Sequence, residues 1–419
     1  MPLRRCKRRR LFICVGLIAV SLVFLIKDTL FVSLFASSFL ADEFFFQSNV
    51  CPACYGTSLC KQLEGRLWIA PYLTDPRASM KGVRYAEWDR QEGKVKVVTK
   101  NLGYAAEIKN FDEALCLRVT GERQCAVHEA VKLFKIKSSE QIPSNLMQSL
   151  TVGLNLSDHF HCMSDRLKRK IIGLYDTDRD GSLNVEESQI LATTLQVNRE
   201  PIILQLFPQD EGWPFPQYYG ACGRTIIAEY GGRTLESYMK KSWEFRVWLS
   251  VQLLQIAFLL TDNSHDWALY LTDIRPANFA LSENGQVLVI DAEHVEIVDM
   301  QEVDRKQVLS DLELKQEDPE CSRNHVRCGI HSSDLMCLGY ERDLNFIYIC
   351  RIMLGFSGYG RLLDNPPVHA KNTIESLLMD CMYYNRHRRR RQAAAELLHY
   401  LVTFLPEGPD QDDLMQKYS

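Results

Sequence analysis

Hydrophobic and polar positions divide this chain into helical and extended segments. Between 245 and 260, apolar side chains recur every three or four residues and predict a long buried helix. The segment 94–100 (KVKVVTK) alternates with a period of two and predicts a strand. Two short apolar runs, 279–282 and 287–290, flank Asn284-Gly285, which is typical of a two-residue β-hairpin turn. Together these elements favour an α+β fold.

The N-terminus has the pattern of a signal-anchor. Six of the first ten residues are Lys or Arg, and residues 11–26 then carry no charge. This run is slightly short for a spanning helix and slightly long for the core of a signal peptide. A second apolar stretch follows at 29–41. Because the basic cluster should stay cytosolic, we expect the bulk of the chain in the lumen. A retained type II anchor is favoured over cleavage near Ala36 or Ala41.

Composition describes a globular chain without a nucleic-acid-binding surface. The 419 residues are 46% hydrophobic and 24% charged, which excludes a disordered or fibrous protein. The 49 basic residues face 53 acidic ones, and the N-terminal ten residues hold six of the 49. The remainder is therefore acidic, which excludes a general nucleic-acid partner. The basic run 386–391 is interpreted as a solvated face.

Fourteen cysteines indicate an oxidising compartment. Cys51, Cys54 and Cys60 cluster in CPACYGTSLC, and two further pairs flank turns, Cys116 with Cys125 and Cys321 with Cys328. Without a compartment, Cys51-x-x-Cys54 would also fit half of a zinc site. In the lumen disulfides are favoured, and their connectivity stays open. Asn155 lies in the one Asn-x-Ser/Thr sequon and would accept a glycan there.

A twelve-residue acidic loop at 176–187 fits the EF-hand calcium loop at each informative position. Residues 162–175 before it and 188–197 after it are predicted to be the flanking helices. Gly181 permits the sharp turn, and hard oxygen ligands on a flexible loop suit calcium. The alternative is a solvated acidic turn between two helices. The expected ligands are Asp176, Asp178, Asp180, the carbonyl of Ser182, Asn184 and the bidentate carboxylate of Glu187.

The hairpin around Asn284-Gly285 is expected to place oxygen ligands side by side. With a two-residue turn, Asn278 and Asp291 are direct cross-strand partners, with Cβ atoms roughly 5 Å apart. An amide oxygen and a carboxylate on one face can share a hard cation such as Mg²⁺. Asp273 precedes Asn278 across a proline-containing turn. The alternative is that these side chains cap loops of a β-rich domain.

The spacing of these residues resembles that of a protein kinase. Asp273-x-x-x-x-Asn278 is similar to the second half of the catalytic loop H-R-D-x-x-x-x-N, and Asp291 stands at the Asp of D-F-G. Arg275 occupies the position where many kinases carry a Lys near the transferred phosphate. The strand 94–100 resembles the one that ends in the nucleotide-binding Lys.

Two segments further along complete this likeness. Residues 216–223 and 224–230 resemble two strands that end in a kinase hinge, where Glu229 and Tyr230 would contact the nucleotide. Residues 392–401, rich in Ala and Leu, resemble the last kinase helix.

The whole chain resembles the divergent protein kinase domain family of the secretory pathway, and within it the branch called "deleted in autism". The blocks CPACYGTSLC, FPQDEGWPFPQYYGACGR and ALYLTDIRPANFA carry the resemblance. The EF-hand insert is similar to that of the sister branch, the cysteine-rich type II endoplasmic-reticulum members. The resemblance implies a kinase-like two-lobed fold, with a β-rich N-lobe and a helical C-lobe. The boundaries expected are a basic tail at 1–10, a signal-anchor or signal peptide at 11–41, a cysteine-rich segment at 42–66, an N-lobe at 67–160 and 199–233 interrupted by the EF-hand insert at 161–198, a C-lobe at 234–405 and a tail at 406–419.

Site roles follow from the resemblance position by position. Lys100 would bind the α- and β-phosphates of ATP, and Asp273 would accept the proton of the substrate hydroxyl. Asn278 and Asp291 would hold Mg²⁺ or Mn²⁺ on the phosphates.

The sequence leaves two candidates for the acidic residue that pairs with Lys100. Glu107 and Glu113 both follow at a plausible distance, and Glu113 is preferred because a helix must first turn back over the sheet.

Several departures from the kinase pattern are visible. Gly82 stands alone where G-x-G-x-x-G is expected, Leu271-Thr272 replaces His-Arg, and Ala292-Glu293 replaces Phe-Gly. No A-P-E motif follows. The metal ligands are retained, whereas regulation through an activation loop is not expected.

Two functions compete on this sequence. The first is a kinase of the endoplasmic reticulum or Golgi lumen that phosphorylates a protein or glycan hydroxyl. The second is a pseudokinase that acts as a secreted or Golgi signalling or trafficking factor on a lumenal or extracellular protein. Either would contact the membrane through its N-terminal segment.

Overall fold

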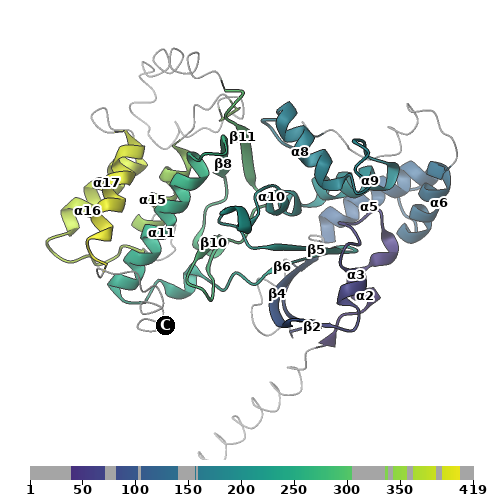
Figure 1. The fold of residues 1–419 in the computed structure, drawn as a ribbon, viewed down its shortest axis with the longest axis horizontal. Helices are drawn as coiled ribbons and strands as arrows, with labels where there is room; N and C mark the ends of the chain where they lie inside the picture. The colour runs from purple at the N-terminus through teal and green to yellow at the C-terminus, as the bar shows by residue number, and fades with distance from the viewer. Residues whose placement is uncertain are drawn as a thin grey trace, which may run out of the picture.

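The computed structural model describes residues 39–70, 82–101, 105–139, 156, 159–303, 336–337, 343–355, 362–383 and 389–405. A mixed sheet-and-helix part is formed by the N-terminal segments, and a mostly helical part by the C-terminal segments (Figure 1). The expected signal-anchor up to residue 38, Asn155, Cys321, Cys328 and the tail 406–419 lie outside the described residues.

The N-terminal sheet has the strand order β1-β2-β3-β4-β6-β5, and each neighbouring pair is antiparallel. The predicted strand 94–100 is confirmed within β4, where Val97 and Thr99 are buried and Lys94 and Lys96 are exposed. Lys100 lies near the end of β4, a central strand, between Val83 of β3 and Ile226 of β6. The strands are β1 (Phe39–Leu40), β2 (Leu67–Ile69), β3 (Val83–Arg90), β4 (Gly93–Asn101), β5 (Tyr218–Cys222) and β6 (Thr225–Glu229).

Between β4 and β5 the chain inserts helices that gather beside the sheet (Figure 1). The predicted helix–loop–helix is present: Ser164 caps the first helix, and Asn184 and Glu187 form a capping box that starts the second. These helices are α5 (Ala105–Thr120), α6 (Val127–Ser139), α8 (Asp165–Tyr175), α9 (Val185–Val197) and α10 (Glu200–Leu206). Before β2 and before β5 lie α2 (Glu43–Phe46), η1 (Ser48–Val50), α3 (Cys60–Leu63) and η4 (Gln209–Glu211).

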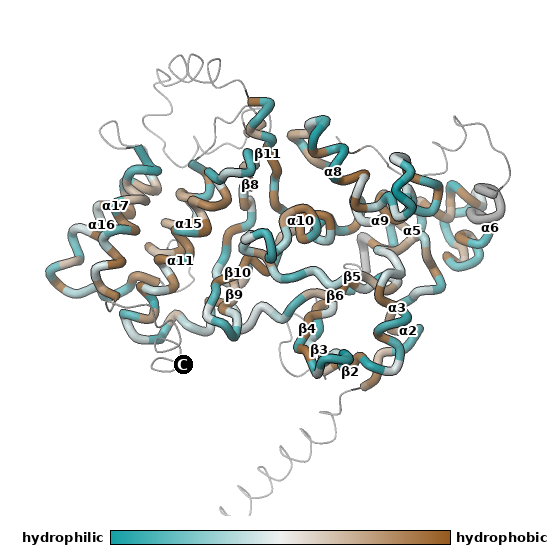
Figure 2. Tube along the Cα trace, in the orientation of Figure 1, coloured by the Kyte–Doolittle hydropathy of each residue, from teal (hydrophilic) through white to brown (hydrophobic). Residues whose placement is uncertain are grey.

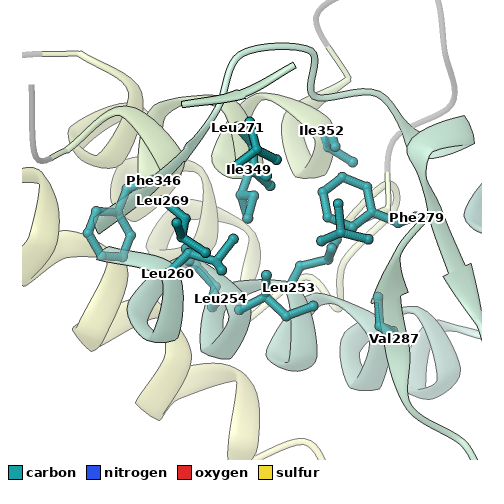
Figure 3. Packing of buried hydrophobic residues seen from close by; sticks show 14 of the residues in the cluster. Leu253, Leu254, Leu260, Leu269, Leu271, Phe279, Val287, Phe346, Ile349 and Ile352 are labelled. Carbon is teal, nitrogen blue, oxygen red and sulfur yellow. The ribbon is translucent and has the colours of Figure 1, made fainter. Parts of the chain in front are cut away.

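The C-terminal part is built around α11 (Trp243–Thr261), the helix expected from the apolar spacing between 245 and 260. Leu253, Leu254 and Leu260 of α11 point toward Leu269 and Phe279 in one packed core (Figure 3). The remaining elements are β7 (Arg233–Thr234), η5 (Leu235–Tyr238), β8 (Trp267–Leu271), η6 (Pro276–Asn278), β9 (Phe279–Leu281), β10 (Val287–Val289), β11 (Val295–Asp299), α15 (Leu344–Leu354), α16 (Lys371–Met382) and α17 (Arg390–Val402).

One hydrophobic cluster connects the two parts. It extends from α8 and α10 through α11 and β8–β10 to α17. Figure 2 shows hydrophobic positions recurring in α10 and β10, near the border of the two parts, and in α11 inside the helical part. Among the described residues, α11 is the helix long and apolar enough to cross a membrane, and most of it is buried in this core. Burial of this cluster therefore holds the sheet and the helices in one relative position.

The β9–β10 hairpin has a different register from the one expected. Ser282 N donates to Gln286 O at 2.9 Å, and Gly285, with a φ of 80°, closes a three-residue turn. The left-handed Gly adds one residue to the turn. The prediction that Asn278 and Asp291 are direct cross-strand partners is therefore wrong, since Ile290 N donates to Asn278 O at 2.9 Å.

Five disulfides join the described cysteines. Cys51–Cys54 and Cys116–Cys125 close short loops, so the favoured disulfide interpretation of the CPAC motif is confirmed. Three others connect distant segments: Cys60–Cys222, Cys162–Cys337 and Cys350–Cys381. Such long loops restrict the unfolded chain most, which favours the folded state.

Candidate active site

A cavity of about 580 Å³ lies where the sheet meets the helical part. Val83, Val98 and Lys100 line it from the sheet, and Asn278 and Asp291 line it from the opposite side. Such a volume at the junction of two parts of a chain is typical of a small-molecule site.

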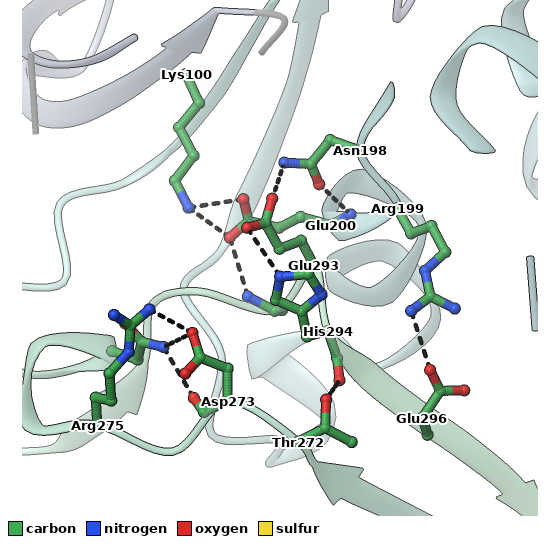
Figure 4. A network of polar contacts seen from close by, with 12 residues as sticks. Lys100, Asn198, Arg199, Glu200, Thr272, Asp273, Arg275, Glu293, His294 and Glu296 are labelled. Carbon is green, nitrogen blue, oxygen red and sulfur yellow. Dashed lines mark hydrogen bonds and ion pairs between the residues drawn. The ribbon is translucent and has the colours of Figure 1, made fainter. Parts of the chain in front are cut away.

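Lys100 is paired with Glu200, the first residue of α10. Its Nζ lies 2.5 and 2.6 Å from the two carboxylate oxygens and also donates to Ile290 O at 2.8 Å (Figure 4). The expectation that Glu113 is the partner is wrong, because Glu113 lies on α5 and pairs with Lys109 at 3.7 Å. The side chain of Glu107 lies outside the described residues.

Sequence reasoning missed Glu200 because a long insert separates it from Lys100. The two residues are 100 positions apart, and α10 has only seven residues. An acidic residue followed by Pro201 at the start of a helix was the available signal.

The charge state of Lys100 is set by its neighbours. Burial lowers the pKa of its ammonium, but the carboxylates of Glu200 and Asp291 outweigh this effect and raise the pKa above its usual value. Lys100 therefore stays protonated beside the cavity. A side chain that binds phosphate must carry such a positive charge.

Asp273 lies in a turn before η6 that its own side-chain contacts hold together. Asn278 Nδ2 donates to Asp273 O at 2.8 Å and to Asp273 Oδ2 at 3.1 Å, and Arg275 forms an ion pair with the same carboxylate (Figure 4). Partial burial raises the pKa of Asp273, but the bonds from Arg275 and Asn278 prevail and lower it below the usual range. The carboxylate is thus ionised and can accept a proton.

Asn278 and Asp291 meet at the cavity despite the changed register. Both line it, and both also line a smaller hollow that contains Asp273 and His294. Asp291 comes just after β10 has ended, where strand alternation no longer dictates the direction of a side chain. Tertiary packing, not the turn, brings these two side chains to one site.

The hinge expected at Glu229 and Tyr230 also borders the cavity. Glu229 N donates to Gln217 O at 2.8 Å, and Tyr230 N donates to Lys96 O at 3.3 Å, so both amides are used within the sheet. The rings of Tyr85 and Tyr230 meet edge to face at 5.1 Å. Tyr85 and Tyr230, which pack against each other, both line the cavity.

Gly231 and Gly232 follow the hinge and were not singled out from the sequence. A Cβ on Gly232 would lie 1.7 Å from Leu281 O, and one on Gly231 would lie 2.8 Å from the Cγ2 of Ile290. The hinge thus packs directly on the β9–β10 hairpin, which brings the sheet edge and Asp291 to the same cavity.

Comparison with known proteins gives the family. Residues 192–384 match the family model described as the protein-kinase domain of FAM69. Divergent protein kinase domain 2A from Mus musculus is 34% identical over 390 residues, which cover 87% of this chain and 88% of the relative. This chain belongs to the divergent protein kinase domain family.

Other members of the family agree with this assignment. Divergent protein kinase domain 2A from Xenopus tropicalis is 34% identical and covers 91% of this chain and 92% of its own length. Divergent protein kinase domain 2B from Homo sapiens is 25% identical over 79% of this chain and 76% of its own length. The family predicted from the sequence is confirmed.

The acidic loop of this divergent kinase-domain chain lies outside the matched family model. Carboxylate oxygens of Asp176, Asp178 and Glu187 lie within 4.8 Å of one another. Asp180 instead accepts from Ser182 N at 2.8 Å and from Ser182 Oγ at 2.7 Å. The structure thus gathers three of the expected oxygen ligands, while an oxygen of Asp180 is bonded to Ser182.

Glu187 and Asn184 have roles inside the helix as well. Asn184 Oδ1 accepts from Glu187 N at 3.0 Å, and Glu187 Oε2 accepts from Asn184 N at 3.0 Å. Glu187 Oε1 accepts from Thr177 N at 2.9 Å. Burial raises the pKa of Glu187, but the bonds that its carboxylate accepts from the Thr177 hydroxyl and from the backbone N–H groups of Asn184 and Thr177 outweigh burial and lower the pKa, so the carboxylate is ionised and suited to a cation.

Proposed function

We propose that this protein binds ATP with Mg²⁺ or Mn²⁺ in the cavity and transfers the γ-phosphoryl group to a hydroxyl of a lumenal protein or glycan. The observation that carries the proposal is the convergence of the Lys100–Glu200 pair with Asn278 and Asp291 on one cavity, next to Asp273. These are the residue types on which phosphoryl transfer depends.

Each residue of the site has a proposed role that follows from its chemistry. The ammonium of Lys100 would bind phosphate oxygens, and Glu200 keeps it pointed at the cavity. Asn278 and Asp291 are hard oxygen donors and would hold the divalent cation, which neutralises phosphate charge when bound. Asp273 would accept the proton of the attacking hydroxyl, with Arg275 beside it as a cation for the transferred phosphate.

Replacing Asp291 by alanine is expected to abolish stabilisation by nucleotide. Ligand at about one hundred times its Kd stabilises a native protein by about 2.7 kcal/mol. The full-length chain should therefore melt several degrees higher with ATP and Mg²⁺ or Mn²⁺, as measured by a thermal shift, and the variant should not. Asp262→Ala, which removes an exposed carboxylate on the helical part, is the control that should still respond. No shift in the unmodified protein would contradict the nucleotide site.

The alternative is a pseudokinase, and one observation favours it. Gly82, just before β3, is the one glycine where kinases carry the G-x-G-x-x-G loop. The sequence therefore lacks the motif whose backbone N–H groups surround the phosphates in kinases. Transfer of labelled phosphate to lumenal acceptors separates the two: nucleotide stabilisation without any transfer, including to itself, would favour the pseudokinase.

A second proposal concerns the loop between α8 and α9, which we infer binds Ca²⁺ through Asp176, Asp178 and Glu187. Asp180 and Asn184 would join after rotating away from their present contacts, and Ser182 would add its carbonyl. The ion would tie α8 to α9 and stabilise the fold.

Substituting Glu187 by glutamine is expected to remove most of the calcium-dependent stabilisation, because a bidentate carboxylate is the main charge at the last loop position. The measurement is the melting temperature of the full-length chain in Ca²⁺ and in EDTA. Glu186→Gln makes the same change at an adjacent exposed position and should keep the calcium response. Equal melting in Ca²⁺ and EDTA for the unmodified protein would refute the calcium site.

The disulfides support a proposal for the compartment of this protein. Five disulfides persist in an oxidising lumen and are rare in the cytosol. They support a protein of the endoplasmic reticulum or Golgi, anchored as a type II membrane protein or released by cleavage, with a lumenal or extracellular protein as its partner.

A further inference from the structure

The segment that replaces the kinase Asp-Phe-Gly motif joins a closed ring of polar contacts. Asn198 Nδ2 donates to Glu293 Oε2 at 2.8 Å, and Asn198 Oδ1 accepts from Glu200 N at 2.7 Å. Glu200 holds Lys100, and Lys100 Nζ donates to Ile290 O at 2.8 Å. The backbone from 290 to 293 closes this ring, hereafter the polar ring (Figure 4).

Only an amide completes the polar ring at position 198. It meets an acceptor, the carboxylate of Glu293, and a donor, the backbone N–H of Glu200, and Asn offers one group of each kind. The reversed amide would set its oxygen against the Glu293 carboxylate and its NH₂ against the Glu200 N–H. An aspartate would repel Glu293, and an alanine would contact neither.

The polar ring sits where a kinase would use an aromatic side chain. Ala292 stands at the Phe position and is fully buried, and its N lies 3.5 Å from Glu200 Oε1. A methyl group buries much less apolar surface than the aromatic side chain it replaces, although Ala292 belongs to the same core cluster as α10. Polar contacts through Asn198 and Glu293 connect α10 to the segment that carries Asp291.

We propose that Asn198 is a positioning residue: through Glu200 and Glu293 it holds Lys100 and Asp291 on the cavity before any nucleotide binds. This inference rests on the proposed nucleotide site. It adds that the arrangement is built into the fold and depends on one side chain that touches neither phosphate nor metal.

The test measures ATP affinity and local opening on the full-length chain. Asn198→Asp and Asn198→Ala should weaken binding of ATP with Mn²⁺ by about tenfold or more, because hydrogen bonds to charged groups are the stronger ones. Glu293→Gln keeps an oxygen that accepts from Asn198 but loses the negative charge, and it should weaken ATP binding less than either Asn198 variant does. Asn198→Ala combined with Glu293→Ala should bind ATP no more weakly than Asn198→Ala alone, since that substitution already breaks the contact with Glu293.

A matched control separates positioning from loss of stability. The side chain of Asn263 also donates and accepts, away from the cavity: Nδ2 donates to Leu259 O at 2.9 Å and to Trp267 O at 2.7 Å, and Oδ1 accepts from His265 N at 3.0 Å. Asn263→Ala should lower the melting temperature and leave ATP affinity unchanged. If Asn198→Asp changes affinity no more than this control does, the positioning role is overturned while the nucleotide site stands.

A second measurement tests the polar ring even if the protein does not bind nucleotide. If the unmodified protein binds no ATP, hydrogen–deuterium exchange of residues 287–296 decides. Asn198→Asp should raise exchange there at least tenfold over Asn263→Ala, because the segment loses its tie to α10. Equal exchange in the two variants would overturn the polar ring as a positioning device.

Discussion

Replacing Glu200 by alanine is expected to lower the free energy of unfolding by about 3 kcal/mol. The Glu200 side chain is 2% exposed and that of Lys100 is 19% exposed, so water cannot replace the lost carboxylate. The variant would leave a poorly hydrated ammonium that still donates to the carbonyl of Ile290 but has lost both carboxylate oxygens of Glu200. Removing one partner of a buried ion pair costs far more than the intact pair contributes.

Two further variants make this prediction specific. Glu113→Ala should change the free energy of unfolding by less than about 0.5 kcal/mol, because its contact with Lys109 is exposed. Lys100→Met combined with Glu200→Leu should recover much of the stability that Glu200→Ala loses, since no charge is then left without a partner. Urea unfolding followed by fluorescence gives all these values. A double variant as unstable as the sum of its single substitutions would mean that the two residues are not coupled.

Substituting Gly232 by alanine is expected to destabilise the protein by about 3 kcal/mol or more. Its φ of 93° is left-handed, which by itself costs an L-residue about 1–2 kcal/mol. The new Cβ would also lie 1.7 Å from Leu281 O and 2.6 Å from its carbonyl carbon. Backbone atoms of a paired strand cannot yield as a flexible side chain does, so the hinge would have to separate from the β9–β10 hairpin.

Gly212 supplies the matched control for this effect. Its φ is 88°, close to that of Gly232, and a Cβ there would meet no atom within 4 Å. Gly212→Ala should therefore show the backbone cost alone, about 1–2 kcal/mol. Urea midpoints of the two variants measure the difference, which is the cost of the close contact. Equal loss in both would show that the hinge can move away from the hairpin freely.

The polar ring and the hinge contact act on the same cavity from two sides. Asn198 and Glu200 fix the segment that carries Asp291, while Gly232 fixes the edge of the sheet against the same hairpin. Both contacts join segments far apart in the sequence, and residues of both line the cavity.

Much of the local structure followed from the sequence alone. The spacing of apolar residues predicted α11, the alternation at 94–100 predicted the strand that carries Lys100, and the acidic loop predicted a helix on either side of it, although α9 begins at Val185 and not at 188. Each of these signals involves neighbours within a few residues, where backbone geometry and side-chain spacing determine the outcome. The family was also recognisable from short local blocks of sequence.

Pairing between distant segments was decided by the tertiary structure. Glu200, not Glu113, meets Lys100, because α10 is placed by the core and not by its distance along the chain. The left-handed Gly285 moved the hairpin by one residue, yet packing still brought Asn278 and Asp291 to one cavity. Periodicity along a chain fixes which face of an element is apolar, whereas the choice of partner depends on the free energy of the whole packed core, which no single segment contains.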